Sequence, residues 1–332
     1  MLNKNADLSV SVIIPAYNAE PWIGQALESV LALDYPADLM EIMVLDDGSS
    51  DATAEAATRA LRASPAPWCV HTCARGGPGR ARNLGVKLTS GKWIQFLDAD
   101  DGLAKNKLSQ QIRVAGRAES AVAVVYSTWD TLVLQEGAWI PARKARKPII
   151  GKDPVADLLR SENFIATGSQ LVNRTWFEKV RGFDEGRRCV EDVNLALRIA
   201  ISGGLFVGCD SEAPLFFYRQ HSGSLSHRDR VAFARGCADN ARLAEAHWRR
   251  VYGILNPEQR VLLLQIYGHA LRVLYARDRE GFSALLVHVE ELEPGYVPSE
   301  PRRLRQLARW IGYQPAEAVA FGYRQVKDWV AK

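Results

Sequence analysis

The sequence predicts an α/β fold, in which a mostly parallel sheet is flanked by helices and followed by a C-terminal helical region. Two observations predict it. Short apolar runs alternate with amphipathic helical segments over the first 100 residues, as in right-handed strand–helix–strand units. Near residue 228 this alternation stops and long helical stretches follow. We therefore expect a first domain over residues 1–228 and a helical region over residues 229–332.

Four strands are expected in this first part, each recognised by its apolar run and by the turn residues that end it. The first, VSVII, stops at Pro15. The second covers residues 41–45, and Asp51 after it is the expected N-cap of the next helix. The third and fourth cover residues 68–72 and 92–97, with a glycine-rich turn and a helix between them.

The middle of the chain is less regular. AVAVVYSTW (residues 121–129) and LVLQEGAWI (residues 132–140) look like a strand pair. Residues 163–186 indicate a strand and a short helix, and residues 189–204 a second helix that ends at two glycines. Residues 214–226 indicate a strand that leads into a polar loop.

The composition narrows the class of protein. Hydrophobic residues make up 47% and charged residues 24% of 332, which is enough for a core. A net charge of +4 suits a phosphorylated ligand or an anionic surface. The sequence contains no basic run with interleaved aromatic residues, the pattern that would indicate nucleic-acid binding. Five scattered cysteines without a CxxC pair fit a reducing cytoplasm. No run is apolar enough to span a membrane, so we expect a soluble or peripheral protein.

Three carboxylates directly follow the fourth strand, in GKWIQFLDADDG: Asp98, Asp100 and Asp101. Two carboxylates at a strand end can share Mg²⁺ or Mn²⁺, which removes their repulsion and can hold a diphosphate. A solvated turn or helix cap is the alternative. Because the carboxyl ends of parallel strands meet at one edge of a sheet, we expect this cluster to lie beside PAYNAE and DDGSSD, which end the first two strands.

Other polar residues at strand ends are candidates for ligand binding. Asp46 and Asp47 follow the second strand and can accept hydrogen bonds from a base or a ribose hydroxyl. The turn GGPGRARNLG, with Arg82, can meet a phosphate at a helix N-terminus. It contains neither GxGxxG nor GK[ST], so it is not a dinucleotide fingerprint or a P-loop.

Two further groups carry alternative interpretations. Glu191 and Asp192 begin a helix, where they either complement the helix dipole or provide a general base. Arg219 and His221 lie in YRQHSGSLS. They either bind phosphate or belong to a structural polar loop.

Taken together, five segments in this order resemble the family 2 glycosyltransferases, which have the GT-A fold. The segments are SVIIPAYNAEPWIGQALESVL, VLDDGSSDAT, GPGRARNLGVKLTSGKWIQFLDADD, the ED pair and RQHSGSLS, within about residues 8–227. The resemblance implies a metal-dependent, inverting glycosyltransferase. Such an enzyme moves a sugar from a nucleotide-diphosphate sugar, here expected to be a UDP-sugar, to a hydroxyl of a glycan, lipid-linked or other acceptor.

The resemblance also implies roles for individual positions. Asp100 is the expected ligand of Mn²⁺ or Mg²⁺, with Asp98 beside it near the ribose and donor sugar, and Asp192 is the expected base. The nucleotide and diphosphate contacts fall on Pro15, Ala16, Tyr17, Glu20, Asp46, Asp47, Arg219 and His221. Two other classes stay open. One is a non-catalytic nucleotide-sugar-binding module. The other is a sugar nucleotidyltransferase, which expects a basic glycine-rich loop where this chain has PAYNAE.

The C-terminal region lies outside the resemblance and has three interpretations. It packs on the catalytic domain and shapes the acceptor site, it forms an oligomer, or it sits on an anionic membrane through its arginines. These arginines are Arg302, Arg303, Arg305 and Arg309, among the apolar residues Leu304, Leu307, Ala308 and Ile311. We expect a cytoplasmic protein, with peripheral contact at the inner face of the membrane left open. The sequence does not identify the sugar, the linkage or the oligomeric state.

Overall fold

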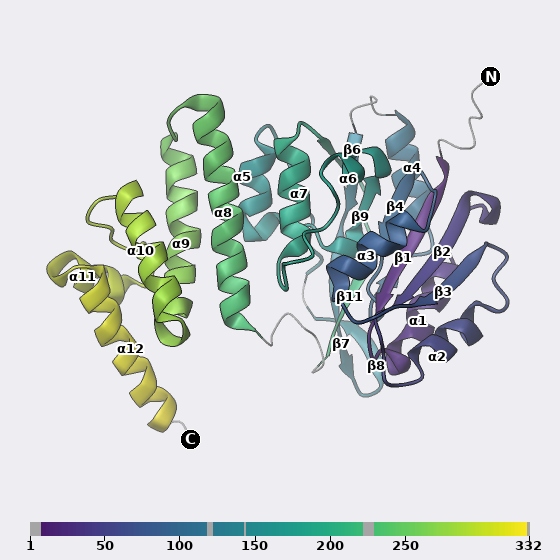
Figure 1. The fold of residues 1–332 in the computed structure, drawn as a ribbon, viewed down its shortest axis with the longest axis horizontal. Helices are drawn as coiled ribbons and strands as arrows, with labels where there is room; N and C mark the ends of the chain where they lie inside the picture. Colours follow the sequence, from purple (N-terminus) through teal and green to yellow (C-terminus); the bar gives the residue numbers. More distant parts are fainter. Residues whose placement is uncertain (1–7, 118–121, 143, 222–228, 331–332) are drawn as a thin grey trace. The chain divides into compact units, whose positions relative to one another are not determined.

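The structure is a computed structural model that describes residues 8–117, 122–142, 144–221 and 229–330. The chain divides into two compact units, Met1–Ser224 and Leu225–Lys332. The first unit is an α/β body and the second is helical (Figure 1). The expected fold class is therefore confirmed.

In the described part of the first unit, seven strands form one sheet in the order β10-β6-β9-β4-β1-β2-β3. The strands are β1 (Val10–Ala16), β2 (Met40–Asp46), β3 (Trp68–Thr72), β4 (Trp93–Phe96), β6 (Val122–Ser127), β9 (Gln170–Asn173) and β10 (Leu205–Cys209). All neighbours are parallel except β9, which runs antiparallel to β4 and β6. The ends of β1, β2 and β4 consequently lie side by side.

Helices cover both faces of this sheet, and the alternation of side chains along β1 decides which residue meets which helix. Val12 and Ile14 belong to one apolar cluster with residues of α1, α2 and α4. Ile13 points the other way, toward α3. The helices of this unit are α1 (Glu20–Leu31), α2 (Thr53–Leu61), α3 (Pro78–Lys87), α4 (Lys107–Arg117), α5 (Pro154–Leu159), α6 (Arg174–Lys179) and α7 (Glu191–Ile201).

Gly85 allows α3 to pack closely on the sheet. A Cβ atom there would lie 2.5 Å from Ile13 Cγ2 and 2.8 Å from Leu45 Cδ2. Both distances are shorter than real Cβ contacts, so a side chain at this position would push the helix away from β1 and β2. The close packing fixes the position of α3, which carries Arg82.

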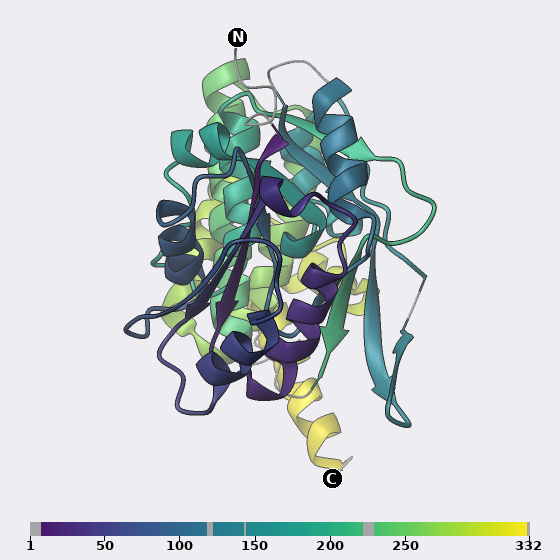
Figure 2. The ribbon, with the colours of Figure 1, turned by 90° about the vertical axis from the view of Figure 1, so that its right-hand side faces the viewer.

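A second, smaller sheet contains four of the described strands, in the order β5-β11-β7-β8. They are β5 (Gly102–Leu103), β7 (Trp129–Gln135), β8 (Ala138–Pro141) and β11 (Phe216–Gln220). Figure 2 shows the β7–β8 hairpin (teal) beside β11 (green), with which β7 pairs in parallel. Because β5 follows the acidic cluster and pairs with β11, this sheet joins the cluster to the segment that carries Arg219.

Two local expectations were wrong. Residues 121–129 and 132–140 do not form a strand pair, because β6 belongs to the large sheet and the hairpin lies between β7 and β8. Asp51 is not the N-cap of α2, which begins two residues later after Ala52. The Asp51 carboxylate instead accepts hydrogen bonds from the backbone N–H groups of Glu20 and Thr53.

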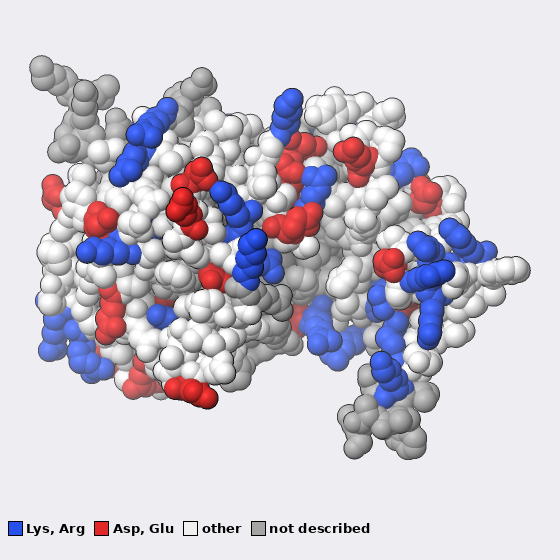
Figure 3. Space-filling view, turned by 180° about the vertical axis from the view of Figure 1, so that it is seen from behind, with Lys and Arg blue, Asp and Glu red and all other residues white. Residues whose placement is uncertain are grey.

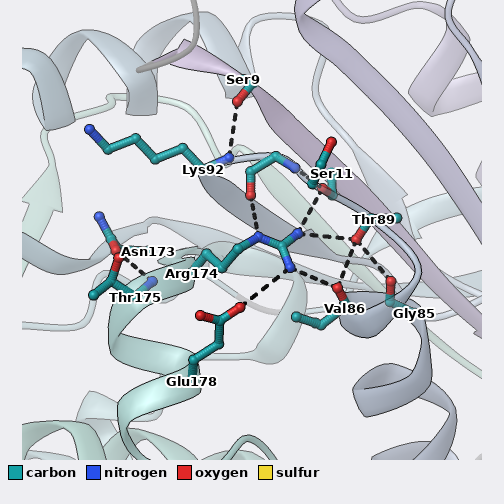
Figure 4. A network of polar contacts seen from close by, with 12 residues as sticks. Ser9, Ser11, Gly85, Val86, Thr89, Lys92, Asn173, Arg174, Thr175 and Glu178 are labelled. Atoms are coloured by element: carbon teal, nitrogen blue, oxygen red, sulfur yellow. Dashed lines mark hydrogen bonds and ion pairs between the residues drawn. The ribbon is translucent and has the colours of Figure 1, made fainter.

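Arg174 joins several segments at the amino-terminal side of the large sheet (Figure 4). Its guanidinium donates to the carbonyls of Gly91 at 2.6 Å and Val86 at 2.7 Å, and to the hydroxyls of Ser11 at 3.2 Å and Thr89 at 3.1 Å. These groups belong to β1, the end of α3 and the loop before β4. Arg174 thus donates to the Gly91 carbonyl and adds a donor to the Val86 carbonyl, which also accepts from Thr89.

The second unit consists, in its described residues, of α8 (Arg230–Tyr252), α9 (Pro257–Arg277), α10 (Arg279–Leu292), α11 (Arg302–Ile311) and α12 (Tyr313–Val330). Glu245 is buried within it and accepts hydrogen bonds from Arg249, Tyr267 and His288. Among the helices described, none is long and apolar enough to cross a bilayer.

Candidate active site

The loops after β1 and β2 are tied together by hydrogen bonds from backbone to side chain. The N–H of Ala19 donates to Thr53 Oγ1 at 2.8 Å. The N–H of Ala52 donates to Glu20 Oε2 at 3.1 Å, so this carboxylate lies at the start of α2. The register pairs Ala16 with Asp46. Pro15, Ala16, Tyr17 and Glu20 thus lie at the sheet edge that carries Asp46 and Asp47.

Tyr17 is exposed, and the guanidinium of Arg75 lies 4.1 Å from the centre of its ring. This cation–π pair joins the loop after β1 to the glycine-rich turn before α3. The two side chains form an accessible aromatic and basic surface beside the strand ends.

Asp46 and Asp47 are both buried, and their carboxylates hold nearby backbone. Asp46 accepts from the N–H of Ser49 at 3.1 Å. Asp47 accepts from the N–H groups of Gly76 and Gly77, both at 2.7 Å. Each carboxylate oxygen can accept more than one hydrogen bond, so Asp47 positions the glycine-rich turn and keeps capacity for a ligand.

Arg82 lies between two carboxylates that are far apart in the sequence. Its side chain is 4% exposed, and it contacts Asp98 Oδ1 at 2.6 Å and Glu191 Oε1 at 2.9 Å. Burial opposes its charge, but Asp98 and Glu191 raise the pKa of the guanidinium. A single cation therefore joins the end of β4 to the start of α7.

The rest of the acidic cluster meets β11. His221 Nε2 lies 2.9 Å from Asp100 Oδ2, and the N–H of Arg219 donates to Asp101 Oδ1 at 2.9 Å. The ring of His221 stacks on Trp22 of α1, with 4.7 Å between centroids. Ser224 and Ser226 of the same sequence segment lie outside the described residues.

The guanidinium of Arg219 has donors available. Within the described part of the chain, its Nε and Nη1 atoms are buried and make no hydrogen bond. The group lies 5.5 Å from the centre of the Trp139 ring. Buried donors without acceptors are costly, so this side chain fits an anion with several acceptor oxygens.

Asp192 stands in the first turn of α7. Its carboxylate accepts from the N–H of Val193 at 2.8 Å and from Thr167 Oγ1 at 3.3 Å. Burial, together with the neighbouring Glu191, raises its pKa to about 7. A carboxylate with this pKa can accept a proton near neutral pH. Val190, just before the helix, has φ 52, a strained conformation for a β-branched residue and one that recurs at functional sites.

A buried amine supports the segment that holds Thr167. Lys107 is fully buried, donates to the side-chain oxygens of Gln95 and Gln111, and has its pKa lowered to about 7 by burial. The amide groups of these glutamines donate to the carbonyls of Gly168 and Ser169. This network fixes the backbone next to Thr167, and it had no signal in the sequence.

The acidic cluster suits a divalent cation. Burial and the charge of Asp98 raise the pKa of Asp100, so the fold brings carboxylates together with too little positive charge around them. Within the described residues, no three His, Cys, Asp or Glu side chains form a ready-made metal site. Asp98 and Asp100 would thus supply part of the oxygen ligands that Mg²⁺ or Mn²⁺ prefers, and a bound phosphate could supply others.

Comparison with known proteins gives a consistent result. The family model described as Glycosyl transferase family 2 matches residues 11–181, just over half of the chain. Succinoglycan biosynthesis protein ExoO of Rhizobium meliloti is 28% identical in an alignment of 272 residues that covers 77% of this chain and 76% of that protein. Other curated relatives are matched over as little as 15% of their length.

Solved structures share the fold. S. aureus TarS 1–349 in complex with UDP-GlcNAc has a TM-score of 0.64 at 20% identity, over 96% of this chain and 92% of that chain. Mannosyltransferase PcManGT from Pyrobaculum calidifontis, in complex with GDP-Man and Mn²⁺, has a TM-score of 0.51 at 21% identity, over 93% of this chain and 86% of that chain. At these identities the likeness establishes the fold.

Proposed function

The chain belongs to glycosyl transferase family 2, and from this premise we propose that it is a metal-dependent, inverting enzyme that uses a nucleotide-diphosphate sugar, with a UDP-sugar as the expected donor. The observation that carries the proposal is the buried Arg82 between Asp98 and Glu191. It brings the acidic cluster that suits a metal and a diphosphate next to Asp192, whose pKa of about 7 suits a base.

The donor would bind at the carboxyl ends of β1, β2 and β4. Asp46, Asp47 and the residues after β1 would contact the base and ribose, since they offer acceptors and an exposed aromatic ring there. The ring of His221 and the buried donors of Arg219, which have no acceptor among the described residues, would contact the diphosphate. Asp100 and Asp98 would hold Mn²⁺ or Mg²⁺, which supplies charge neutralisation of the diphosphate when bound.

The reaction would be a single displacement. The acceptor oxygen attacks the anomeric carbon from the face opposite to the diphosphate, the bond to the diphosphate breaks, and Asp192 takes the hydroxyl proton. The anomeric configuration is inverted. Thr167 and the N–H of Val193 would keep the Asp192 carboxylate oriented. No covalent glycosyl-enzyme is required, in contrast to retaining glycosidases.

The biological setting is proposed from the relatives. ExoO is named for succinoglycan biosynthesis, so we propose that this protein acts in polysaccharide biosynthesis, on a glycan or lipid-linked acceptor. We also propose that it acts in the cytoplasm, with peripheral contact at the inner face of the membrane.

The test is a donor-hydrolysis screen over nucleotide sugars with Mn²⁺, Mg²⁺ or chelator. We expect metal-stimulated release of one nucleoside diphosphate. Release of inorganic pyrophosphate from a sugar phosphate and a nucleoside triphosphate would instead indicate a nucleotidyltransferase. Nucleotide binding without hydrolysis or transfer to any acceptor would indicate a non-catalytic binding module.

A further inference from the structure

Helix α11, with the sequence RRLRQLARWI, presents two different faces. Leu304 and Ala308 are each only 3% exposed and pack inside the C-terminal unit. Two residues of the apolar stripe that the sequence suggested for membrane contact are therefore used in the protein's own core, whereas Leu307 is half-buried and Ile311 is exposed. The face opposite to Leu304 and Ala308 is exposed to external partners.

The opposite face is basic and carries one large aromatic side chain. At 100° per residue, Arg302, Arg303, Gln306, Arg309 and Trp310 fall within an arc of about 120°, and all five are exposed. Trp310 is 88% exposed, the highest value among the large hydrophobic side chains whose burial the structure describes. We call these five residues the α11 outer face.

The charge of this face is not compensated locally. Helix α11 contains four arginines and no acidic residue. In the part of the chain that the structure describes, none of its three exposed arginines takes part in an ion pair, although Glu300 lies two residues before the helix. Figure 3 shows Lys and Arg side chains gathered over the C-terminal helices at the right-hand end, with fewer Asp and Glu side chains among them.

We propose that the α11 outer face binds an anionic phospholipid surface, with its arginines at the headgroup phosphates and Trp310 in the interfacial layer. Arginines without counter-charges are attracted to anionic lipid, and an indole is favoured where an apolar region meets a polar one. This surface deepens the membrane contact included in the proposed function. It does not depend on which sugar is transferred.

A nucleic acid is the less suitable partner. Binding to its phosphates would use the arginines but would leave an almost fully exposed indole without an apolar environment, unless bases were unstacked onto it. A single helix of ten residues offers one such platform, whereas single-strand binding proteins use a groove with several. Lipid explains both kinds of side chain.

The experiment is co-sedimentation of the full chain with phosphatidylcholine vesicles, with or without phosphatidylglycerol. We expect binding only to the anionic vesicles, weakened by salt. Each arginine near an anionic surface contributes about fivefold to partitioning, so the double variant Arg303→Gln/Arg309→Gln should bind about 25-fold more weakly. Trp310→Ser should lose about tenfold.

Matched controls remove equivalent groups elsewhere. Arg59→Gln/Arg62→Gln removes two exposed charges from the end of α2, and Tyr252→Ser removes an aromatic side chain that is 61% exposed. Both should bind vesicles as the wild type does. The proposal is overturned if anionic vesicles do not bind, if the α11 variants bind normally, or if the chain binds RNA and not lipid. Donor hydrolysis, measured without vesicles, should be equal in the wild type and in all these variants. If none of them hydrolyses a donor, the proposed function is contradicted, whereas the lipid-binding result still stands.

Discussion

Replacing Asp192 by asparagine should abolish most of the transfer activity while leaving the fold and the donor site intact. Asparagine keeps the size of the side chain, its oxygen can accept from the N–H of Val193 as Oδ1 does, and its NH2 group can donate to Thr167 Oγ1 in place of the bond that Oδ2 accepts. It cannot accept the proton of the acceptor hydroxyl. Loss of a positioned general base costs about 10²- to 10⁴-fold in rate, and we expect a decrease of kcat in this range.

The pH dependence of kcat/KM in the wild type gives a second measurable effect of Asp192. Burial and Glu191 raise the pKa of Asp192 to about 7. The carboxyl group would be about half ionised at that pH and about one-tenth ionised one unit lower, so kcat/KM should fall about tenfold per unit below about pH 7. The variant should lack this limb.

The contribution of Asp192 to the free energy of unfolding should change with pH in the opposite direction to kcat/KM. Because the folded-state pKa of Asp192 is raised, the folded protein binds more protons than the unfolded chain between roughly pH 4 and 7, and this residue lowers stability as pH rises through that window. The Asp192→Asn variant should therefore gain stability relative to wild type above about pH 7 and not below about pH 4. Thermal unfolding at several pH values measures this difference.

The assay is transfer or donor hydrolysis followed by nucleoside diphosphate release, with Asp210→Asn as control. Asp210 is a carboxylate whose side chain is 91% exposed and paired with Lys147. Near-normal turnover by Asp192→Asn, or a profile without an ionisation near pH 7 in the wild type, would refute the assignment of the base.

Three further predictions concern the groups around the base and the frame of the sheet. Asp100→Ala should abolish the gain in UDP affinity that Mn²⁺ gives the wild type; calorimetry with and without the metal measures it, and an unchanged gain would contradict the metal site. Arg82→Met should destabilise by about 3 kcal/mol in urea unfolding, because it leaves two carboxylates without their cation. It should also move the acidic limb of kcat/KM upward, since Arg82 lowers the pKa of Asp192; an unmoved limb would show that the two are not coupled. Arg174→Met should cost about 3 kcal/mol by removing the four hydrogen bonds that join β1, α3 and the loop before β4, with kcat per folded molecule unchanged; a lowered kcat would show that Arg174 also acts on the site.

The strands and their ends were predictable because their signals are local. The third strand runs over residues 68–72 as expected, and β1, β2 and β4 differ from expectation by at most two residues at either end. The acidic clusters directly follow apolar runs, and parallel strands carry such ends to one edge. The candidate residues at this edge could be named for the same reason.

Pairings between distant segments were not predictable. Arg82 and Glu191 are separated by 109 positions, and nothing near either residue indicates the other. Strand β6 pairs with β9, which runs antiparallel to its neighbours in an otherwise parallel sheet. The position of β9 in the sheet therefore decides where β6 pairs. The stacking of Trp22 on His221 had no local signal either, because it depends on where the end of β11 lies relative to α1.

Arg174 has a consequence for protein engineering. Its bonds hold β1, the end of α3 and the loop before β4 at one side of the sheet, whereas the segments proposed to select the donor leave from the other side. Chimeras that exchange residues 17–20, 47–53 and 73–77 with those of a relative would therefore keep this anchor unaltered. Donor specificity could be exchanged together with these three loops. If such a chimera failed to fold, the cause would lie where the exchanged loops join the sheet, because the contacts of Arg174 are unchanged.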